Sequence, residues 1–257
     1  MDKKLSEPLS YSRISTFYEC PQQYEFKYVK KIETPPHWYF SYGKSIHAVL
    51  ERLLQCHVGP DSCLYAGTGE LFGTSLQQML EEVWLHEGYQ SPESEARYHR
   101  EALRVLTGFF PIFQATWQEM LYTERLITTE VDGIPFTGIV DRIDRIAEGL
   151  YRIVDYKSSR PREVATLKSH RFQVALYAAA LAQDAEFREA RFVLQTYYLR
   201  ENLKAELNGD AEEYIAKSRQ VLVKAASHIA RGDFRGRRSS KCFSCDFRNI
   251  CPVFKRS

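Results

Sequence analysis

Apolar positions recur at helical spacing in the first part of the chain. Residues 10–29 combine aromatic side chains at this spacing with Ser and Thr as candidate N-caps, which predicts one or two short helices broken near Pro21. Residues 43–56 predict a clearer amphipathic helix. Its apolar face consists of Ile46, Val49, Leu50, Leu53 and Leu54.

A helical insertion is expected over residues 57–121. Its first part, residues 57–70, contains glycines and has the composition of a loop. Residues 71–88 and 94–121 show no strong turn signal inside them, and each predicts a helix.

From residue 122 the pattern changes to short runs of β-branched and aromatic residues, which predict strands. The runs are residues 124–133, 134–146 and 150–159, separated by Asp-Gly at 132–133 and Glu-Gly at 148–149. Both dipeptides are hairpin signals, so the three strands are expected to form a meander.

The rest of the chain predicts a helix over 170–185, a strand over 190–202 and a helix over 211–233. We find no repeat and no linker that would divide the chain. Residues 1–257 are therefore expected to form a single α/β domain with the helical insertion inside it.

Composition narrows the class of protein. The 257 residues are 44% hydrophobic and 26% charged, as in ordinary globular proteins. No apolar run approaches the length of a membrane span, and no apolar region follows the lysines near the start, so a cytoplasmic protein is expected. The net charge of +2 gives no argument for or against a polyanionic partner. The local cluster that could bind such a partner is the basic run 231–241.

Asp141, Asp155 and Lys157 lie on two neighbouring predicted strands. A three-residue turn centred on Glu148, with Gly149 in the left-handed position, would make Asp141 and Asp155 cross-strand partners. Lys157, two residues after Asp155, would share its face. Two such carboxylates suit Mg²⁺ or Mn²⁺, and a lysine beside the metal could stabilise negative charge on a phosphoryl group. Taken alone, Asp-x-Lys is more often an ordinary surface pair.

Four cysteines have the spacing of a metal site. Cys242, Cys245 and Cys251 are close together, and Cys20 would have to come from the other end of the chain. The spacing leaves zinc and an iron–sulfur cluster equally open. The other two cysteines, Cys56 and Cys63, are expected to be free thiols.

Six motifs occur in the order typical of one family. They are "SYSRISTFYECPQQYEFKYV" at the start, "GKSIHAVLE", "GIVDRIDRI", "IVDYKSS", "QVALY", and "CFSCDFRNIC" near the end. Together they resemble the PD-(D/E)XK nuclease superfamily, and within it the RecB-like and Cas4-like branch with a four-cysteine iron–sulfur cluster. The motif "IVDYKSS" has Asp-x-Lys where many relatives have Glu-x-Lys, which keeps the carboxylate but shortens its reach.

The resemblance implies a restriction-endonuclease-like core, a mixed central sheet flanked by helices. It implies that His47, Asp141, Asp155 and the backbone carbonyl of Tyr156 hold Mg²⁺ or Mn²⁺, and that Lys157 is the catalytic lysine. It also favours a [4Fe–4S] cluster over Zn²⁺ at Cys20 and residues 234–257. Read without the resemblance, a lone helix histidine such as His47 is more often a half-buried or solvated residue than a ligand. Glu124, in the strand before the metal acids, is a candidate extra acid that is assigned a structural role.

Other residues are expected to bind substrate. Gln173 and Tyr177, four residues apart, share a helix face, and the resemblance places them next to the catalytic lysine. Arg171 accompanies them, together with Arg160, Arg162 and Lys168. Arg237 and Arg238 in the basic run would contact phosphates if the cluster fixes that run beside the site, although such runs are usually solvated loops.

These features predict a metal-dependent DNA nuclease acting on single strands or ends. DNA repair or recombination and CRISPR adaptation are the two expected settings, with a helicase or CRISPR adaptation proteins as partners. Because these residues contain no G-x4-G-K-[S/T] motif, unwinding is assigned to another chain. The alternatives are a catalytically silent DNA-end-binding or assembly subunit and a zinc-stapled interaction module.

Overall fold

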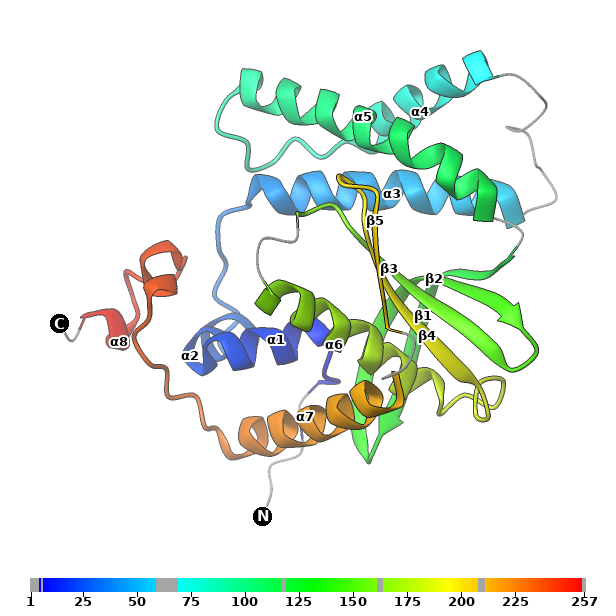
Figure 1. Ribbon diagram of the computed structural model, residues 1–257. Coiled ribbons are helices and arrows are strands. Elements are labelled where there is room, and N and C mark those ends of the chain that lie inside the picture. Colours follow the sequence, from blue (N-terminus) through cyan, green and yellow to red (C-terminus); the bar gives the residue numbers. More distant parts are fainter. Residues whose placement is uncertain are drawn as a thin grey trace.

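Five strands form one mixed sheet in the order β1-β2-β3-β4-β5 (Figure 1). The computed structural model describes residues 5, 7–58, 69–116, 119–160, 164–207 and 211–255. The strands are β1 (Met120–Val131), β2 (Ile134–Ala147), β3 (Leu150–Lys157), β4 (Arg191–Tyr198) and β5 (Leu203–Leu207). Among these five described strands, only β3 and β4 pair in parallel, and α6 (Val164–Leu181) connects them.

The remaining helices lie around this sheet. They are α1 (Tyr11–Glu19), α2 (Pro21–Tyr24) with a π-helical turn (Glu25–Val29), α3 (Trp38–Val58), α4 (Gly69–Val83), α5 (Pro92–Thr116), α7 (Ala211–Arg231), a 3₁₀ turn (Ser240–Ser244) and α8 (Pro252–Lys255). The break expected near Pro21 is confirmed: α1 ends at Glu19, and Pro21 opens α2, where a missing N–H costs nothing. None of the described helices is long and apolar enough to cross a membrane.

Two hydrophobic cores lie on opposite faces of the sheet. On one face α6 and α7 pack over it, and residues such as Phe136, Leu176 and Leu222 are fully buried there. On the other face α3, α4 and α5 form a helical layer (Figure 1) whose core includes Phe109 and Tyr156. The mixed α/β architecture expected from the sequence is confirmed.

The hairpins set the register of the first three strands. Asp132 and Gly133 both have positive φ, 52° and 75°, as a tight two-residue hairpin turn requires. The second turn differs from the expected three-residue loop, because Ala147 pairs with Leu150 and a bulge precedes Ala147. The bulge restores the expected register, so Arg142 pairs with Val154.

Several predicted boundaries are wrong. The helix expected over 71–88 is α4, which ends at Val83, and the helix expected over 170–185 is α6, which ends at Leu181. The expected strand 190–202 is a hairpin of β4 and β5, because Asn202 takes a left-handed conformation (φ 49°) that turns the chain back. The expected helix 94–121 ends at Thr116, and β1 begins at Met120. The helix expected from residue 43 begins at Trp38. The loop expected over residues 57–70 falls largely outside the described residues.

Candidate metal and catalytic site

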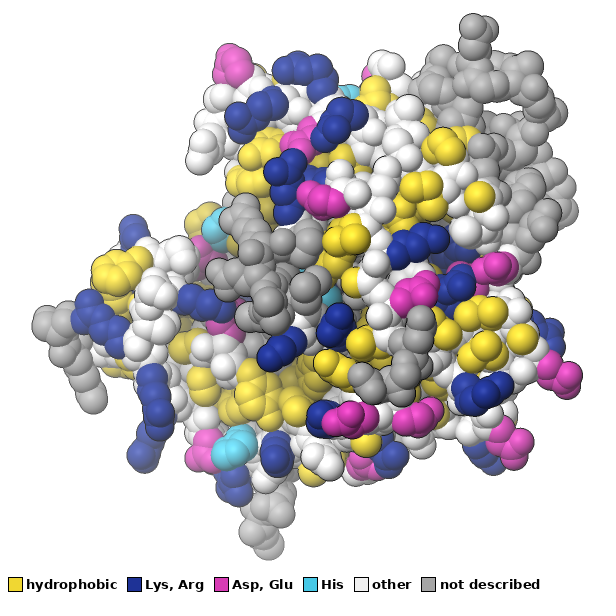
Figure 2. Space-filling model, viewed as in Figure 1, with side chains coloured by type: hydrophobic (Ala, Val, Ile, Leu, Met, Phe, Trp, Pro, Cys, Tyr) yellow, Lys and Arg dark blue, Asp and Glu magenta, His cyan; other side chains and the backbone are white. Residues whose placement is uncertain are grey.

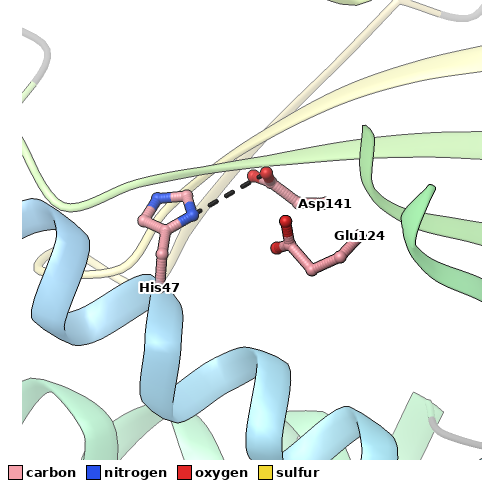
Figure 3. A group of neighbouring side chains, drawn as sticks. All are labelled: His47, Glu124 and Asp141. Carbon is pink, nitrogen blue, oxygen red and sulfur yellow. Dashed lines mark ion pairs between the residues drawn. The ribbon is translucent and has the colours of Figure 1, made fainter. Parts of the chain in front are cut away.

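His47, Glu124 and Asp141 converge from three elements, namely α3, β1 and β2 (Figure 3). One ligand atom from each lies within 4.8 Å of the others. The His47 Nδ1 atom is 3.7 Å from Asp141 Oδ1. Donor atoms bound to one ion at about 2.1 Å lie at most about 4.2 Å apart, so small adjustments would let all three hold one Mg²⁺ or Mn²⁺. An imidazole and two carboxylates are suitable donors for such an ion.

Asp141 is held in place by the neighbouring strand. Its Oδ2 atom accepts a hydrogen bond of 2.6 Å from the backbone N–H of Tyr156, and only 9% of the residue is exposed. The last pair of the β2–β3 ladder is Arg142 with Val154. Asp141 and Asp155 are the next position on each strand beyond that pair. The register therefore brings Asp141 next to the backbone of Tyr156, whose carbonyl is an expected ligand.

Glu124 joins this group, although the sequence analysis named it as a candidate extra acid and then assigned it a structural role. Its backbone is left-handed (φ 45°), and the β1–β2 ladder skips it, with Thr123 paired to Arg142 and Arg125 to Val140. Burial, together with the charges of Asp141 and Glu51, raises the pKa of Glu124 to about 8. Extending the β1–β2 register along the sequence would have predicted Glu124 as a member of this group, because Glu124 is the residue opposite Asp141.

Lys157 and Asp155 form a buried pair at the end of β3. The Lys157 ammonium donates to Asp155 Oδ1 at 3.0 Å and lies 2.8 Å from Oδ2. Burial is the largest effect and disfavours the ammonium, but the Asp155 charge and hydrogen bond, together with the Asp141 charge, outweigh it and raise the pKa of Lys157. Burial also raises the pKa of Asp155. Asp155 was expected to be a metal ligand. Among the described residues, the ligand group consists of His47, Glu124 and Asp141, and Asp155 is not part of it.

Helix α6 contacts Lys157 through Gln173. The Gln173 Oε1 atom accepts from the Lys157 ammonium at 2.7 Å, and its Nε2 donates to the Tyr177 hydroxyl at 2.9 Å. The Tyr177 ring lies over Gly138 of β2, where an added Cβ would be 2.7 Å from Tyr177 Cε1. Gln173 and Tyr177 are therefore placed beside the lysine, and Gly138 makes room for the tyrosine.

Another α6 residue, His170, lies near the same pair. Its Nδ1 atom is 2.9 Å from the hydroxyl of Tyr198, which pairs with Lys157 in the β3–β4 ladder. Burial and the Lys157 charge lower the pKa of His170 to about 4. The imidazole is therefore neutral near pH 7.

Asp144 belongs to a different network. It is 1% exposed and forms ion pairs with Arg142 and with Arg152, the latter at 3.2 Å. Arg142 also donates to the carbonyl of Thr116 at 2.7 Å. The two aspartates of β2, three residues apart, thus serve separate sites, as the strand pattern predicts.

The four predicted cysteines line one pocket. Cys20 precedes α2, and Cys242, Cys245 and Cys251 come from the segment after α7. Among the described residues, no three of their sulfur atoms lie within 4.8 Å of one another. Tetrahedral zinc with Zn–S bonds of about 2.3 Å would need sulfur atoms about 3.8 Å apart. The four sulfurs are therefore spread more widely than a zinc site requires.

The basic residues lie in two places. Arg171 on α6 is close enough to Tyr198 to lower its pKa electrostatically, although burial of that tyrosine has the larger effect and raises the pKa. Arg237 lines the cysteine pocket, and Arg238 lies over the Phe254 ring at 5.2 Å. Figure 2 shows basic side chains gathered on the lobe that is formed by the segment after α7. Arg162, Cys56 and Cys63 fall outside the residues or side chains that the structure describes.

The lobe is attached to the helix that carries His47. The His37 Nε2 atom, just before α3, is 3.0 Å from both carboxylate oxygens of Asp246. Lys241 forms an ion pair with Glu19 of α1. The segment after α7 is thus connected both to the first helix and to the start of α3.

Comparison with known proteins identifies the family. The family model of the PD-(D/E)XK nuclease superfamily matches residues 8–252. The chain belongs to this superfamily. Two relatives from Streptococcus pyogenes, both named as a subunit of an ATP-dependent helicase/deoxyribonuclease, are similar: the serotype M49 protein is 30% identical over 69% of this chain, and a serotype M3 protein is 29% identical over 70%. This chain spans 17% of the length of each relative.

A solved structure agrees with this assignment at the level of fold. A protein from Eubacterium rectale, provisionally named an exonuclease, has a TM-score of 0.56 over 98% of this chain and 90% of its own, at 12% identity. The superfamily expected from the six motifs is confirmed. The Cas4-like branch and the iron–sulfur cluster stay predictions.

Proposed function

We propose that this superfamily member is a metal-dependent DNA nuclease that acts on single strands or free ends. The observation that carries the proposal is the convergence of His47, Glu124 and Asp141 in a chain whose neighbouring strand ends in the buried Asp155–Lys157 pair. The names of the Streptococcus pyogenes relatives support deoxyribonuclease activity.

The metal site would use His47, Glu124 and Asp141, with Asp155 and the carbonyl of Tyr156 as further candidate ligands. A bound Mg²⁺ or Mn²⁺ supplies Lewis acidity toward a phosphodiester and lowers the pKa of water. The chain's own residues hold this site in shape: the Tyr156 N–H fixes one Asp141 oxygen, and α3 positions His47.

Lys157 would stabilise the negative charge that builds up on the phosphoryl oxygens during hydrolysis. Its charge is retained, because Asp155 raises its pKa despite burial. Gln173 orients the ammonium through a 2.7 Å hydrogen bond, so little reorganisation is needed when charge develops. Tyr177 and Arg171 would complete the substrate side of α6.

At the four cysteines we propose a [4Fe–4S] cluster. The family resemblance favours this cluster over a single zinc ion, and all four cysteines line one pocket. Such a cluster would join Cys20 to the segment after α7, so its binding energy would contribute to folding. Arg237 and Arg238 would then form a phosphate-contacting rim.

DNA is the proposed substrate, and a helicase is the partner that the relatives' names favour. A role in DNA repair or recombination rests on the sequence resemblance. A Cas4-like role in CRISPR adaptation rests on the sequence resemblance.

Cleavage of end-labelled linear and circular single-stranded DNA with Mn²⁺ or Mg²⁺ tests the proposal. We expect the unaltered protein to degrade linear strands and spare circles, and the Lys157→Ala variant to cut neither. If both proteins bind DNA and neither cuts it, the nuclease proposal fails for this chain, and a DNA-end-binding subunit becomes the better description.

A further inference from the structure

Helix α3 carries an exposed stripe that leads away from His47. One face of the helix is buried against α4 and α5, through residues such as Tyr42, Ile46 and Val49. On the opposite face lie Phe40 and His47, seven residues apart, which an α-helix sets on the same side about 10 Å apart. The two residues therefore lie on one open surface of the molecule.

Phe40 is unusually exposed for its size. The residue is 52% accessible, and its ring meets the ring of Tyr39 at a centroid distance of 4.6 Å. Tyr39 in turn stacks on His37 at 5.0 Å with an interplanar angle of 14°. One side of the Phe40 ring is thus supported by neighbouring aromatic residues, while the ring stays accessible to solvent.

The end of the catalytic strand lies along the same stripe. Gly43, three residues after Phe40 and four before His47, lies against Ser158, whose Oγ atom would be 3.2 Å from a Cβ at that position. Ser158 directly follows Lys157. Lys44, exposed beside Gly43, adds a positive charge to this surface. Phe40 therefore lies near the candidate site and next to a cation that suits a phosphate.

We propose that Phe40 is a base-stacking subsite for a single DNA strand, about three nucleotides from the phosphate at the His47–Lys157 site. At about 3.4 Å per stacked step, three nucleotides span the roughly 10 Å between Phe40 and His47. Only an unpaired base can offer its face to a side chain, so the subsite selects single strands over duplex. The inference rests on the proposed function, because it takes a DNA strand as the substrate.

The test uses single-stranded oligonucleotides with 2-aminopurine at successive positions, in EDTA so that no strand is cut. We expect the fluorescence of 2-aminopurine to be quenched most at one position. Phe40→Leu should abolish this quenching and weaken single-strand binding at least about 5-fold, the low end for loss of a base–aromatic stack. Phe40→Tyr, which keeps an aromatic ring, should retain both. Binding of blunt duplex should not change.

Tyr18→Leu is the matched control, since Tyr18 is 51% exposed but lies on α1. Equal binding and quenching in Phe40→Leu and the unaltered protein would overturn the inference. So would an equal loss in Tyr18→Leu, or an equal loss for blunt duplex. Phe40→Gln provides a second variant, and thermal unfolding shows that each variant is folded.

The outcomes separate this inference from the nuclease proposal. Lys157-dependent cleavage with no effect of Phe40 would remove the subsite and leave the nuclease. Phe40-dependent quenching without any cleavage would remove the nuclease and leave a single-strand-binding surface.

Discussion

The Lys157 ammonium on β3 donates a 2.7 Å hydrogen bond to the amide oxygen of Gln173 on α6. Because α6 is the connection between the parallel strands β3 and β4, the crossover itself positions the candidate catalytic lysine. The position of the lysine thus depends on packing of α6 as well as on the strand that carries it.

Replacement of this lysine should abolish cleavage. In Lys157→Met we expect the rate to fall about 10²–10³-fold, the loss typical when one group that stabilises transition-state charge is removed. Lys224→Met on α7 is the control, since Lys224 is exposed. Equal cleavage rates in Lys157→Met and the unaltered protein would rule out the assigned role.

The same variant should show a pH-dependent loss of stability. Burial raises the pKa of Asp155, and removing the lysine takes away the charge that opposes this rise. A carboxyl with a raised pKa binds its proton more tightly in the folded state, so stability is lost as pH rises. Urea unfolding should show a larger deficit at pH 8 than at pH 5. A deficit independent of pH would contradict the buried pairing.

Metal affinity should depend on Glu124. Because the pKa of this carboxyl is raised to about 8, a proton must leave before a cation binds below that pH. Electron paramagnetic resonance titration with Mn²⁺ should show affinity rising between pH 7 and 8 and levelling above. In Glu124→Gln the affinity should be weaker and this rise should disappear.

A matched control for the metal titration is His86→Ala. The His86 Nδ1 atom is 2.6 Å from Glu95, so the pair resembles His47 and Asp141 without belonging to the three-ligand group. Mn²⁺ affinity should be unchanged in this variant. An equal loss in both variants would mean that Mn²⁺ is binding elsewhere.

Gly138 should tolerate no side chain. The added Cβ in Gly138→Ala would lie 2.7 Å from the Tyr177 ring, which should cost about 1–3 kcal/mol and displace Gln173 from Lys157. Gly108→Ala in α5 meets nothing closer than 4.0 Å and should be stabilising by about 0.4–1 kcal/mol. Thermal unfolding and cleavage assays would distinguish the Gly138→Ala and Gly108→Ala variants. Identical behaviour of the two variants would exclude the predicted clash with the Tyr177 ring.

The two aspartates of β2 should behave differently. Asp144→Ala leaves the buried Arg142 charge unpaired and should cost about 3–5 kcal/mol without changing Mn²⁺ affinity per folded molecule. Asp141→Asn should weaken Mn²⁺ binding instead. Loss of metal affinity in Asp144→Ala would show that the two networks are coupled.

Iron analysis tests the cysteine pocket. Protein purified without oxygen should be brown and contain iron and sulfide, and Cys242→Ser should lose both and unfold at a lower temperature. Cys56→Ser and Cys63→Ser should keep the cluster, as expected for free thiols. Stoichiometric zinc in a colourless protein would replace the cluster proposal with a zinc site.

The sequence predicted those parts of the site that depend on local signals. The Glu-Gly signal predicted Asp141 and Asp155 as cross-strand partners, and the observed register puts them at the two positions just beyond the last pair of the ladder. Helix spacing correctly joined Gln173 to Tyr177. Cys20 was grouped with the distant cysteines as one metal site, and the structure places all four around one pocket.

Glu124 and Asn202 were missed for a physical reason. Both take left-handed backbone conformations, which Glu adopts rarely and Asn more readily, and neither is accompanied by a glycine that would signal a turn. Glu124 lies opposite Asp141 because the register set at the Val131–Ile134 end of the hairpin continues along β1 and β2. The closeness of Glu124 to His47 depends on packing of α3 over the sheet, and no local sequence pattern predicts that packing.

The meeting of Cys20 with the segment after α7 fixes an order of events during protein synthesis. The ribosome makes Cys20 early, but its three companions emerge only after every strand of the sheet has been translated. The sheet and α6 can therefore assemble around Lys157 before the pocket exists. Closing the pocket is a late maturation step, and it occurs only on chains whose synthesis has proceeded past Cys251.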